Sequence, residues 1–143
     1  MSQLITYLTF NGNCREAMLF YQNCLGGELY FQTLEDSPKT ENLPNNYKKY
    51  IIQAFLKKEN MLLMGTDLFD EDKLLQGNTI SILLKSNNET EIRQYYSSLA
   101  EKKTMALPLK RNHWGHLFGS ITDKYGIRWL FSCSKKEKSV TTF

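Results

Sequence analysis

One short pattern occurs twice in this chain, 75 residues apart, and it restricts the fold more than any other feature. An asparagine with a glutamate three residues on opens an apolar helix pattern at Asn13 and again at Asn88. A short β-rich run precedes each helix pattern, at residues 5–10 and 80–84, and more such runs follow it. Because a duplicated unit cannot bury its apolar face alone, we expect the two copies to pack around a shared concave space.

The first copy predicts a βαβββ module. Asn13 and Glu16 form the pattern of a capping box, so a helix should begin at Cys14 and stop at Gly26-Gly27. From Cys14 onward, apolar residues recur at helical spacing, which predicts an amphipathic helix. The strands are expected at 5–10, 29–34, 50–57 and 61–64, with a polar loop at 35–46.

The second copy predicts the same order of elements. Its helix carries the apolar stripe Ile92, Tyr95, Tyr96 and Leu99. Strands are expected at 80–84, 105–109, 115–122 and 127–133, with a hairpin turn at 123–126. We therefore predict an α+β fold of two βαβββ modules in a single domain, 1–143. Module 1 covers about 4–66, a linker 67–77, module 2 about 78–133 and a polar tail 134–143.

Acidic residues gather between the two modules. Asp67 and the acids at 70–72 lack the register of a calcium loop, so we predict a solvated linker.

Composition excludes several classes of protein. No apolar run approaches the roughly 20 residues that a membrane span needs. The net charge of +3 is too small, and the basic residues too scattered, to predict nucleic-acid binding. The N-terminus lacks the pattern of a secretion signal, and three cysteines without a CxxC pair suit a reducing compartment. We therefore expect a cytoplasmic protein.

Two motifs in the second copy carry a family resemblance. Trp114-Gly-x-x-x-Gly119 is followed by Asp123-x-x-Gly126-x-x-Trp129. Together with the Asn13 region, they resemble the PhnB-like branch of the vicinal oxygen chelate superfamily, the glyoxalase and bleomycin-resistance fold. The resemblance covers about residues 4–133. It implies two modules whose mixed sheets curl around a cavity, commonly in a homodimer.

The resemblance also implies where a metal would be held. Metal-dependent members use four His, Gln or Glu ligands, one from the first and one from the last strand of each module. The matching positions here are Thr6, Met64, Ser81 and Leu130. None is a good ligand for a divalent cation, and a shift of one residue adds only the Tyr7 phenol. We therefore predict these four residues as cavity-lining, with no metal and no cofactor.

Two histidines offer a different metal hypothesis. His113 and His116 are three residues apart, so in an extended segment their side chains would point to opposite faces. We expect one of them to line the cavity or its mouth and the other to meet solvent.

Two further residues are candidates for the cavity wall. Trp114 either fills the scaffold, as large strand aromatics do, or forms part of the wall. Arg128 shares side-chain parity with Leu130, so it could offer bidentate binding to a carboxylate or phosphate. Its alternative role is an ion pair with Asp123 or Glu28 at the sheet edge.

These observations favour a protein that binds an unidentified small molecule in the cavity between its modules, without a catalytic metal. A metal-dependent lyase or dioxygenase-type enzyme of the same superfamily is one alternative. A dimeric interaction module without catalysis is the other.

Overall fold

The computed structural model describes residues 1–33, 50–68, 74–101 and 105–134. The predicted loop at 35–46, the acids at 70–72 and most of the polar tail lie outside these ranges. The chain forms two compact units, residues 1–75 and 76–143, and each is described by itself. Their boundary falls within the predicted linker, 67–77. No helix among the described residues is long and apolar enough to cross a membrane.

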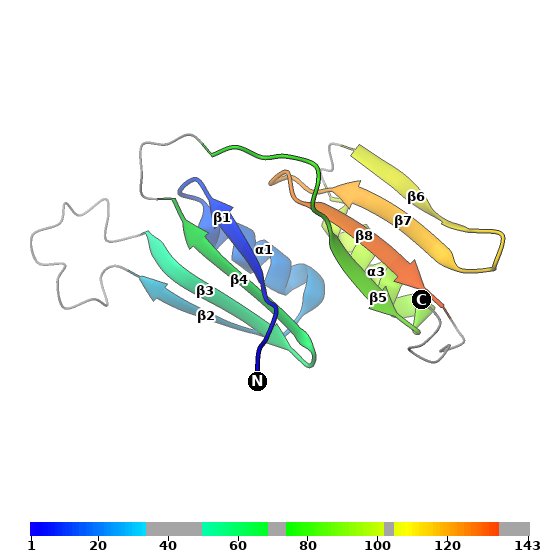
Figure 1. Ribbon diagram of the computed structural model, residues 1–143, viewed down its shortest axis with the longest axis horizontal. Helices are drawn as coiled ribbons and strands as arrows, with labels where there is room; N and C mark the ends of the chain where they lie inside the picture. Colours follow the sequence, from blue (N-terminus) through cyan, green and yellow to red (C-terminus); the bar gives the residue numbers. More distant parts are fainter. Residues whose placement is uncertain (34–49, 69–73, 102–104, 135–143) are drawn as a thin grey trace, which may run out of the picture. The chain divides into compact units, whose positions relative to one another are not determined.

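The first unit has the predicted βαβββ order (Figure 1). Its sheet is open and four-stranded, in the order β1-β4-β3-β2, with β1 parallel to β4 and the other neighbours antiparallel. The last strand is longer than the predicted 61–64 and ends at Asp67. The elements are β1 (Thr6–Phe10), α1 (Cys14–Leu25), β2 (Glu28–Thr33), β3 (Ile51–Lys58) and β4 (Met61–Asp67).

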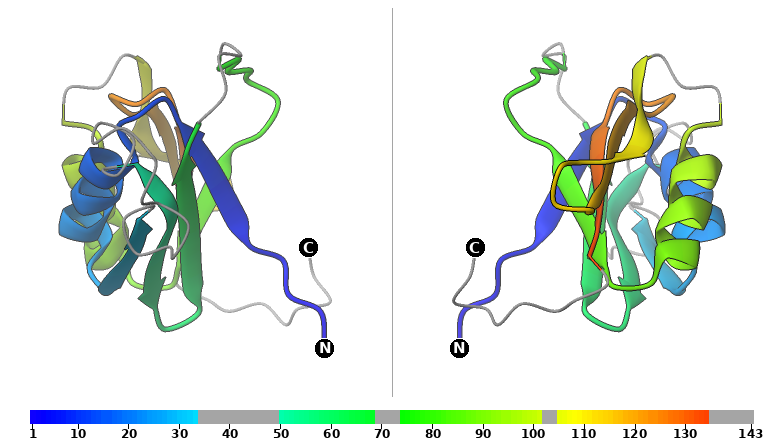
Figure 2. Two further views of the ribbon diagram at one scale, coloured as in Figure 1. Left: turned by 90° about the vertical axis from the view of Figure 1, so that its left-hand side faces the viewer. Right: turned by 90° about the vertical axis from the view of Figure 1, so that its right-hand side faces the viewer.

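Helix α1 covers one face of this sheet (Figures 1 and 2). Cys14, Ala17, Met18, Tyr21 and Leu25 of the predicted apolar stripe are buried, whereas Cys24, also predicted to belong to it, is half-buried. A Cβ atom on Gly65 of β4 would lie 3.1 Å from the Cys14 sulfur and 3.2 Å from the Met18 sulfur. The helix and the strand therefore pack closely because position 65 has no side chain.

The start of α1 differs from the prediction. Asn13 precedes the helix but forms no side-chain capping bond, so the predicted capping box is wrong. Instead Asp67 accepts a hydrogen bond from the Cys14 backbone N–H (2.9 Å) and another from the Ile51 N–H (2.8 Å). Asp67 is only 3% exposed, so its assignment to a solvated linker is also wrong. One buried carboxylate joins the ends of β4, α1 and β3.

The second unit repeats the βαβββ order. Its open sheet has the order β5-β8-β7-β6, with β5 parallel to β8. The first strand begins two residues later than predicted, and β6 has a register irregularity between Leu107 and Lys110, where Pro108 has no N–H to donate. The elements are β5 (Ile82–Ser86), α3 (Glu89–Leu99), β6 (Met105–Arg111), β7 (Leu117–Thr122) and β8 (Arg128–Cys133).

Helix α3 buries Ile92, Tyr95 and Leu99, three of the four residues of its predicted stripe. Tyr96, the fourth, packs edge-on against Phe131 of β8 with ring centroids 5.2 Å apart. Here the asparagine does cap the helix, since the Asn88 side chain accepts from the Glu91 N–H (3.1 Å). The two copies of the repeated pattern therefore begin their helices by different means.

Candidate functional site

Each sheet has one face covered by its helix and one that the helix does not cover, and strand register decides which residues lie on the second. In unit 1, Gly65 faces α1, so its neighbour Met64 points to the uncovered face. Met64 pairs with Tyr7 on one side and Phe55 on the other, and Phe55 pairs with Tyr30. These four residues form one row across the whole sheet, which we call the aromatic row.

The strand register of β1 differs from the sequence match by one residue: Tyr7, and not Thr6, lies on the uncovered face. Thr6 pairs with Leu63, so it lies on the face that α1 covers. Tyr7, which is 48% exposed, is the residue of β1 beside Met64. The sequence match assigned Thr6 and missed Tyr7, because a shift of one residue moves a side chain to the other face of a strand.

Unit 2 has an equivalent row. Phe131 packs on α3, so its neighbour Leu130 points to the uncovered face. Leu130 pairs with Leu83 and Ser120, and Ser120 pairs with Leu107. We call these four residues the leucine row. Ser81 is half-buried and precedes β5, so Leu83 and not Ser81 stands beside Leu130.

Met64 and Leu130 occupy corresponding places in the two sheets, as the internal repeat predicts. Each lies in the last strand of its unit, between the parallel first strand and an antiparallel neighbour. With Tyr7 and Leu83 beside them, these positions offer a phenol, a thioether and two aliphatic side chains. Such a donor set does not fit a divalent cation. Among the described residues, no group of three or more His, Cys, Asp or Glu could hold a metal ion.

Arg128 has the side-chain parity that the sequence predicts. It is exposed and alternates along β8 with the buried Trp129, on the same face as Leu130 and Ser132. Within the described part of the chain, Arg128 forms no ion pair. Asp123, one of its predicted partners, instead accepts bonds from the backbone of the 123–127 turn.

The hairpin turn between β7 and β8 explains the Asp-x-x-Gly-x-x-Trp motif. Asp123 is fully buried and accepts from the Tyr125 N–H (2.8 Å), the Ile127 N–H (3.0 Å) and the Trp129 indole N–H (2.8 Å). Gly126 supplies the left-handed residue, with φ +84°. Trp129 is 1% exposed, so this tryptophan has a structural role in the core of the unit.

The other end of β7 has a turn of the same design, at residues 112–116. The Asn112 side chain accepts from the Trp114 N–H (3.0 Å) and the His116 N–H (2.9 Å), and Gly115 has φ +77°. The segment is therefore a turn and not the extended strand predicted from residue 115. The argument that spacing places His113 and His116 on opposite faces of a strand does not apply here.

The same turn exposes its aromatic residue. Trp114 is 76% exposed, so the prediction that it fills the scaffold of a strand is wrong. His113 is exposed beside it, with ring centroids 6.3 Å apart, and His116 is half-buried. Their predicted place in a cavity wall stays a prediction.

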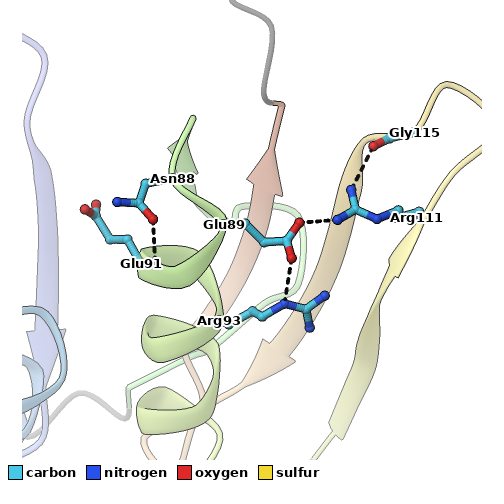
Figure 3. A network of polar contacts seen from close by, with 6 residues as sticks. All are labelled: Asn88, Glu89, Glu91, Arg93, Arg111 and Gly115. Carbon is cyan, nitrogen blue, oxygen red and sulfur yellow. Dashed lines mark hydrogen bonds and ion pairs between the residues drawn. The ribbon is translucent and has the colours of Figure 1, made fainter.

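A polar network that the sequence did not reveal holds this turn to α3 (Figure 3). Glu89, in the first turn of α3, accepts from Arg93 (3.2 Å) and from Arg111 at the end of β6. Arg111 also donates to the Gly115 carbonyl (3.1 Å). The Arg111 and Arg93 guanidinium groups lower the pKa of the Glu89 carboxyl. The network fixes the turn that carries His113 and Trp114.

A surface hollow, wide open to solvent, lies beside this network. It is lined by Asn87, Asn88, Glu89 and Thr90, and it contains none of the predicted site residues. The hollow therefore does not coincide with the aromatic row or the leucine row.

The two βαβββ units define a class of protein. They have the fold of the glyoxalase and bleomycin-resistance proteins of the vicinal oxygen chelate superfamily. Residues 2–132 match the family described as 3-demethylubiquinone-9 3-methyltransferase, and the chain belongs to this PhnB-like family.

Relatives of similar length agree with this assignment. Protein YjdN of Escherichia coli is 27% identical, with 94% of this chain and 97% of YjdN covered. The crystal structure of PA1353 from Pseudomonas aeruginosa is 32% identical, has a TM-score of 0.81, and the match covers 94% and 98% of the chains. A PhnB protein from Bacillus cereus, described as a 3-demethylubiquinone-9 3-methyltransferase, is 24% identical with a TM-score of 0.72, covering 93% and 100%.

The fold also extends to a structure with a bound small molecule. A bleomycin-binding protein complexed with bleomycin is 14% identical, with a TM-score of 0.57 and coverage of 94% and 99%. At this identity the likeness is one of fold alone.

Proposed function

We propose that this protein binds a small molecule through the uncovered faces of its sheets, without a catalytic metal. The observation that carries the proposal is the pair of equivalent rows. The aromatic row and the leucine row each cross a whole sheet on the face opposite its helix, with Met64 and Leu130 at matching places.

Aromatic and aliphatic side chains in such rows suit an apolar ligand. Tyr7 and Tyr30 are about half exposed, and Leu83 and Leu107 are more than half exposed. Between these exposed side chains lie Met64 and Ser120, which are only 9% and 5% exposed. Exposed apolar side chains gathered on one face mark an interaction site more often than single scattered ones do. Rings of Tyr7 and Phe55 can stack on a flat ligand, and the flexible Met64 between them can adapt to its shape.

The fold is suited to such a role. In the bleomycin-binding relative the same fold accompanies a bound small molecule, which supports the proposal at the level of fold. The family is described as a methyltransferase. The proposed function does not include methyl transfer and requires only the aromatic row and the leucine row. The homodimer and the cytoplasmic location stay predictions, the first of which sedimentation analysis would test.

Elemental analysis and thermal unfolding test the absence of a metal. We expect no stoichiometric ion in the purified protein and no stabilisation by Mn²⁺, Fe²⁺, Ni²⁺ or Zn²⁺. A neutral aromatic compound such as 1-naphthamide should instead raise the unfolding temperature, because a ligand of the folded state stabilises it by about 2.7 kcal/mol at 100 times its Kd. One bound ion per chain with a clear stabilisation would favour the metal-dependent enzyme.

A pair of matched variants tests the surface. Tyr7→Ser should weaken 1-naphthamide binding by roughly two- to tenfold, the usual contribution of one aromatic contact. Leu19→Ser is the control, because Leu19 is similarly exposed (43% against 48%) but lies on α1. Equal losses in the two variants would contradict the assignment of binding to the sheet face.

A further inference from the structure

The uncovered face of unit 2 carries positive charge on both sides of the leucine row. On one side Lys85 pairs with Ser132, Ser132 with Phe118, and Phe118 with Lys110, which gives a second row across the sheet. On the other side Arg128 pairs with Thr122. Lys85, Lys110 and Arg128 are all exposed.

No described residue on this face is acidic. The corresponding face of unit 1 differs, because there Glu28 stands directly beside Lys57 in the strand register. Cations without acidic neighbours create a positive potential over the surface between them, and an apolar surface strengthens it. The charge of the face therefore selects for an anion.

We propose that the ligand is an organic anion, with one carboxylate or phosphate group on an apolar body. The proposal rests on the proposed function and names the chemical class of its ligand. The body lies on the leucine row, and Arg128 binds the anionic group.

Arg128 is better suited to this role than the two lysines. It is two residues from Leu130 along β8, roughly 6.6 Å in a strand, so its side chain reaches the edge of the leucine row. It forms no ion pair among the described residues, so its planar set of donors is available for a bidentate contact. Thr122 is its partner in the strand register and offers a hydroxyl group on the same face. Lys85 and Lys110 add attraction from the far side of the row.

The test compares three probes that share one ring system: 1-naphthoate, 1-naphthyl phosphate and neutral 1-naphthamide. Calorimetric titration of the full chain should show at least one anion binding about tenfold more tightly than the amide, as a charged hydrogen bond would give. The ratio of the two anions shows whether a carboxylate or a phosphate is preferred. Raising the salt from 50 to 500 mM should shrink the preference, since exposed charges are screened.

Substitution then assigns the preference to one residue. Arg128→Gln should remove about tenfold of the affinity for the preferred anion and leave that for 1-naphthamide unchanged, which also shows that the variant is folded. Lys124→Gln is the matched control, because Lys124 is an exposed cation in the neighbouring turn and its loss changes the net charge equally. It should leave all three affinities unchanged.

The outcomes separate the two proposals. Binding of all three probes with equal affinity, or equal losses in Arg128→Gln and Lys124→Gln, overturns the anion assignment and leaves the proposed function standing. Binding of none of the probes overturns the proposed function, and the anion assignment with it.

Discussion

Replacing Asp67 should destabilise the protein more than replacing any other buried polar residue described in unit 1. Asp67→Ala leaves the Cys14 and Ile51 N–H groups without the carboxylate that now accepts from both, at 2.9 and 2.8 Å. An unsatisfied buried donor costs about 1–3 kcal/mol, and a lost helix cap about 1 kcal/mol. Two such donors give an expected loss of about 2–6 kcal/mol, of which the lost helix cap is a part. Asp67→Asn keeps one acceptor oxygen and should lose about half as much.

Urea unfolding followed by circular dichroism at 222 nm measures this loss. Tryptophan fluorescence is a poor probe for it, because both tryptophans, Trp114 and Trp129, lie in the second unit. The midpoint should fall with little change in slope.

The two asparagines of the repeated pattern are the controls. Asn13→Ala should change the free energy of unfolding by less than about 0.5 kcal/mol, because Asn13 makes no capping bond. Asn88→Ala should cost about 1 kcal/mol, because Asn88 does cap its helix. A large loss in Asn13→Ala together with a small one in Asp67→Ala would refute the reasoning.

Three further predictions concern single groups. Because the pKa of Glu89 lies below the ordinary value of 4.5, its ion pairs are intact above about pH 4.5 and are lost as the pH falls further. The Gly115 amide resonance should therefore move as the pH falls below 4.5 in the wild type and stay still in Glu89→Gln. Burial raises the pKa of the Cys14 thiol to about 12, so iodoacetamide at pH 8 should label the half-buried Cys24 first by mass spectrometry; rapid labelling of Cys14 in the folded protein would argue against its burial. In Gly27→Ala the alanine would have to adopt a φ of +99°, and its Cβ would lie 2.6 Å from the Lys57 carbonyl oxygen. We expect this variant to lose about 2–4 kcal/mol in urea unfolding. Gly77→Ala is the control and should be neutral, because its Cβ would meet nothing within 4 Å.

The repeated order of elements could be predicted from sequence because it depends on local periodicity. The apolar stripe from Cys14 to Leu25 and the Gly26-Gly27 stop both fix α1 without reference to the rest of the chain. The Asp123 turn was predictable for the same reason, since the bonds that Asp123 accepts from Tyr125, Ile127 and Trp129 lie within seven residues of the chain.

The errors arose where partners are distant in sequence. Asp67 caps a helix 53 residues away, so its neighbours in the chain suggested a linker and the local Asn13 suggested a cap. Likewise the Glu89–Arg111 ion pair spans 22 residues and follows no helical spacing. Such contacts require the tertiary arrangement.

The places of two candidate residues in their sheets were predicted, while their role in binding stays a prediction. The correspondence of Met64 and Leu130 followed from the repeat, because each lies in the last strand of its unit, beside the parallel first strand. Thr6 and Ser81 were assigned by matching positions across loops, where an error of one residue moves a side chain to the other face. The match therefore missed Tyr7 and Leu83.

Methyl resonances give the most direct test of the central claim that the uncovered sheet faces bind the ligand. Protein labelled at the methionine and leucine methyl groups would be titrated with 1-naphthoate and followed by two-dimensional NMR. The account predicts saturable shifts for Leu83 and Leu130 of the leucine row, with none for Leu19 on α1. Shifts at Leu19 alone, or a titration that moves none of these methyl groups, would contradict it.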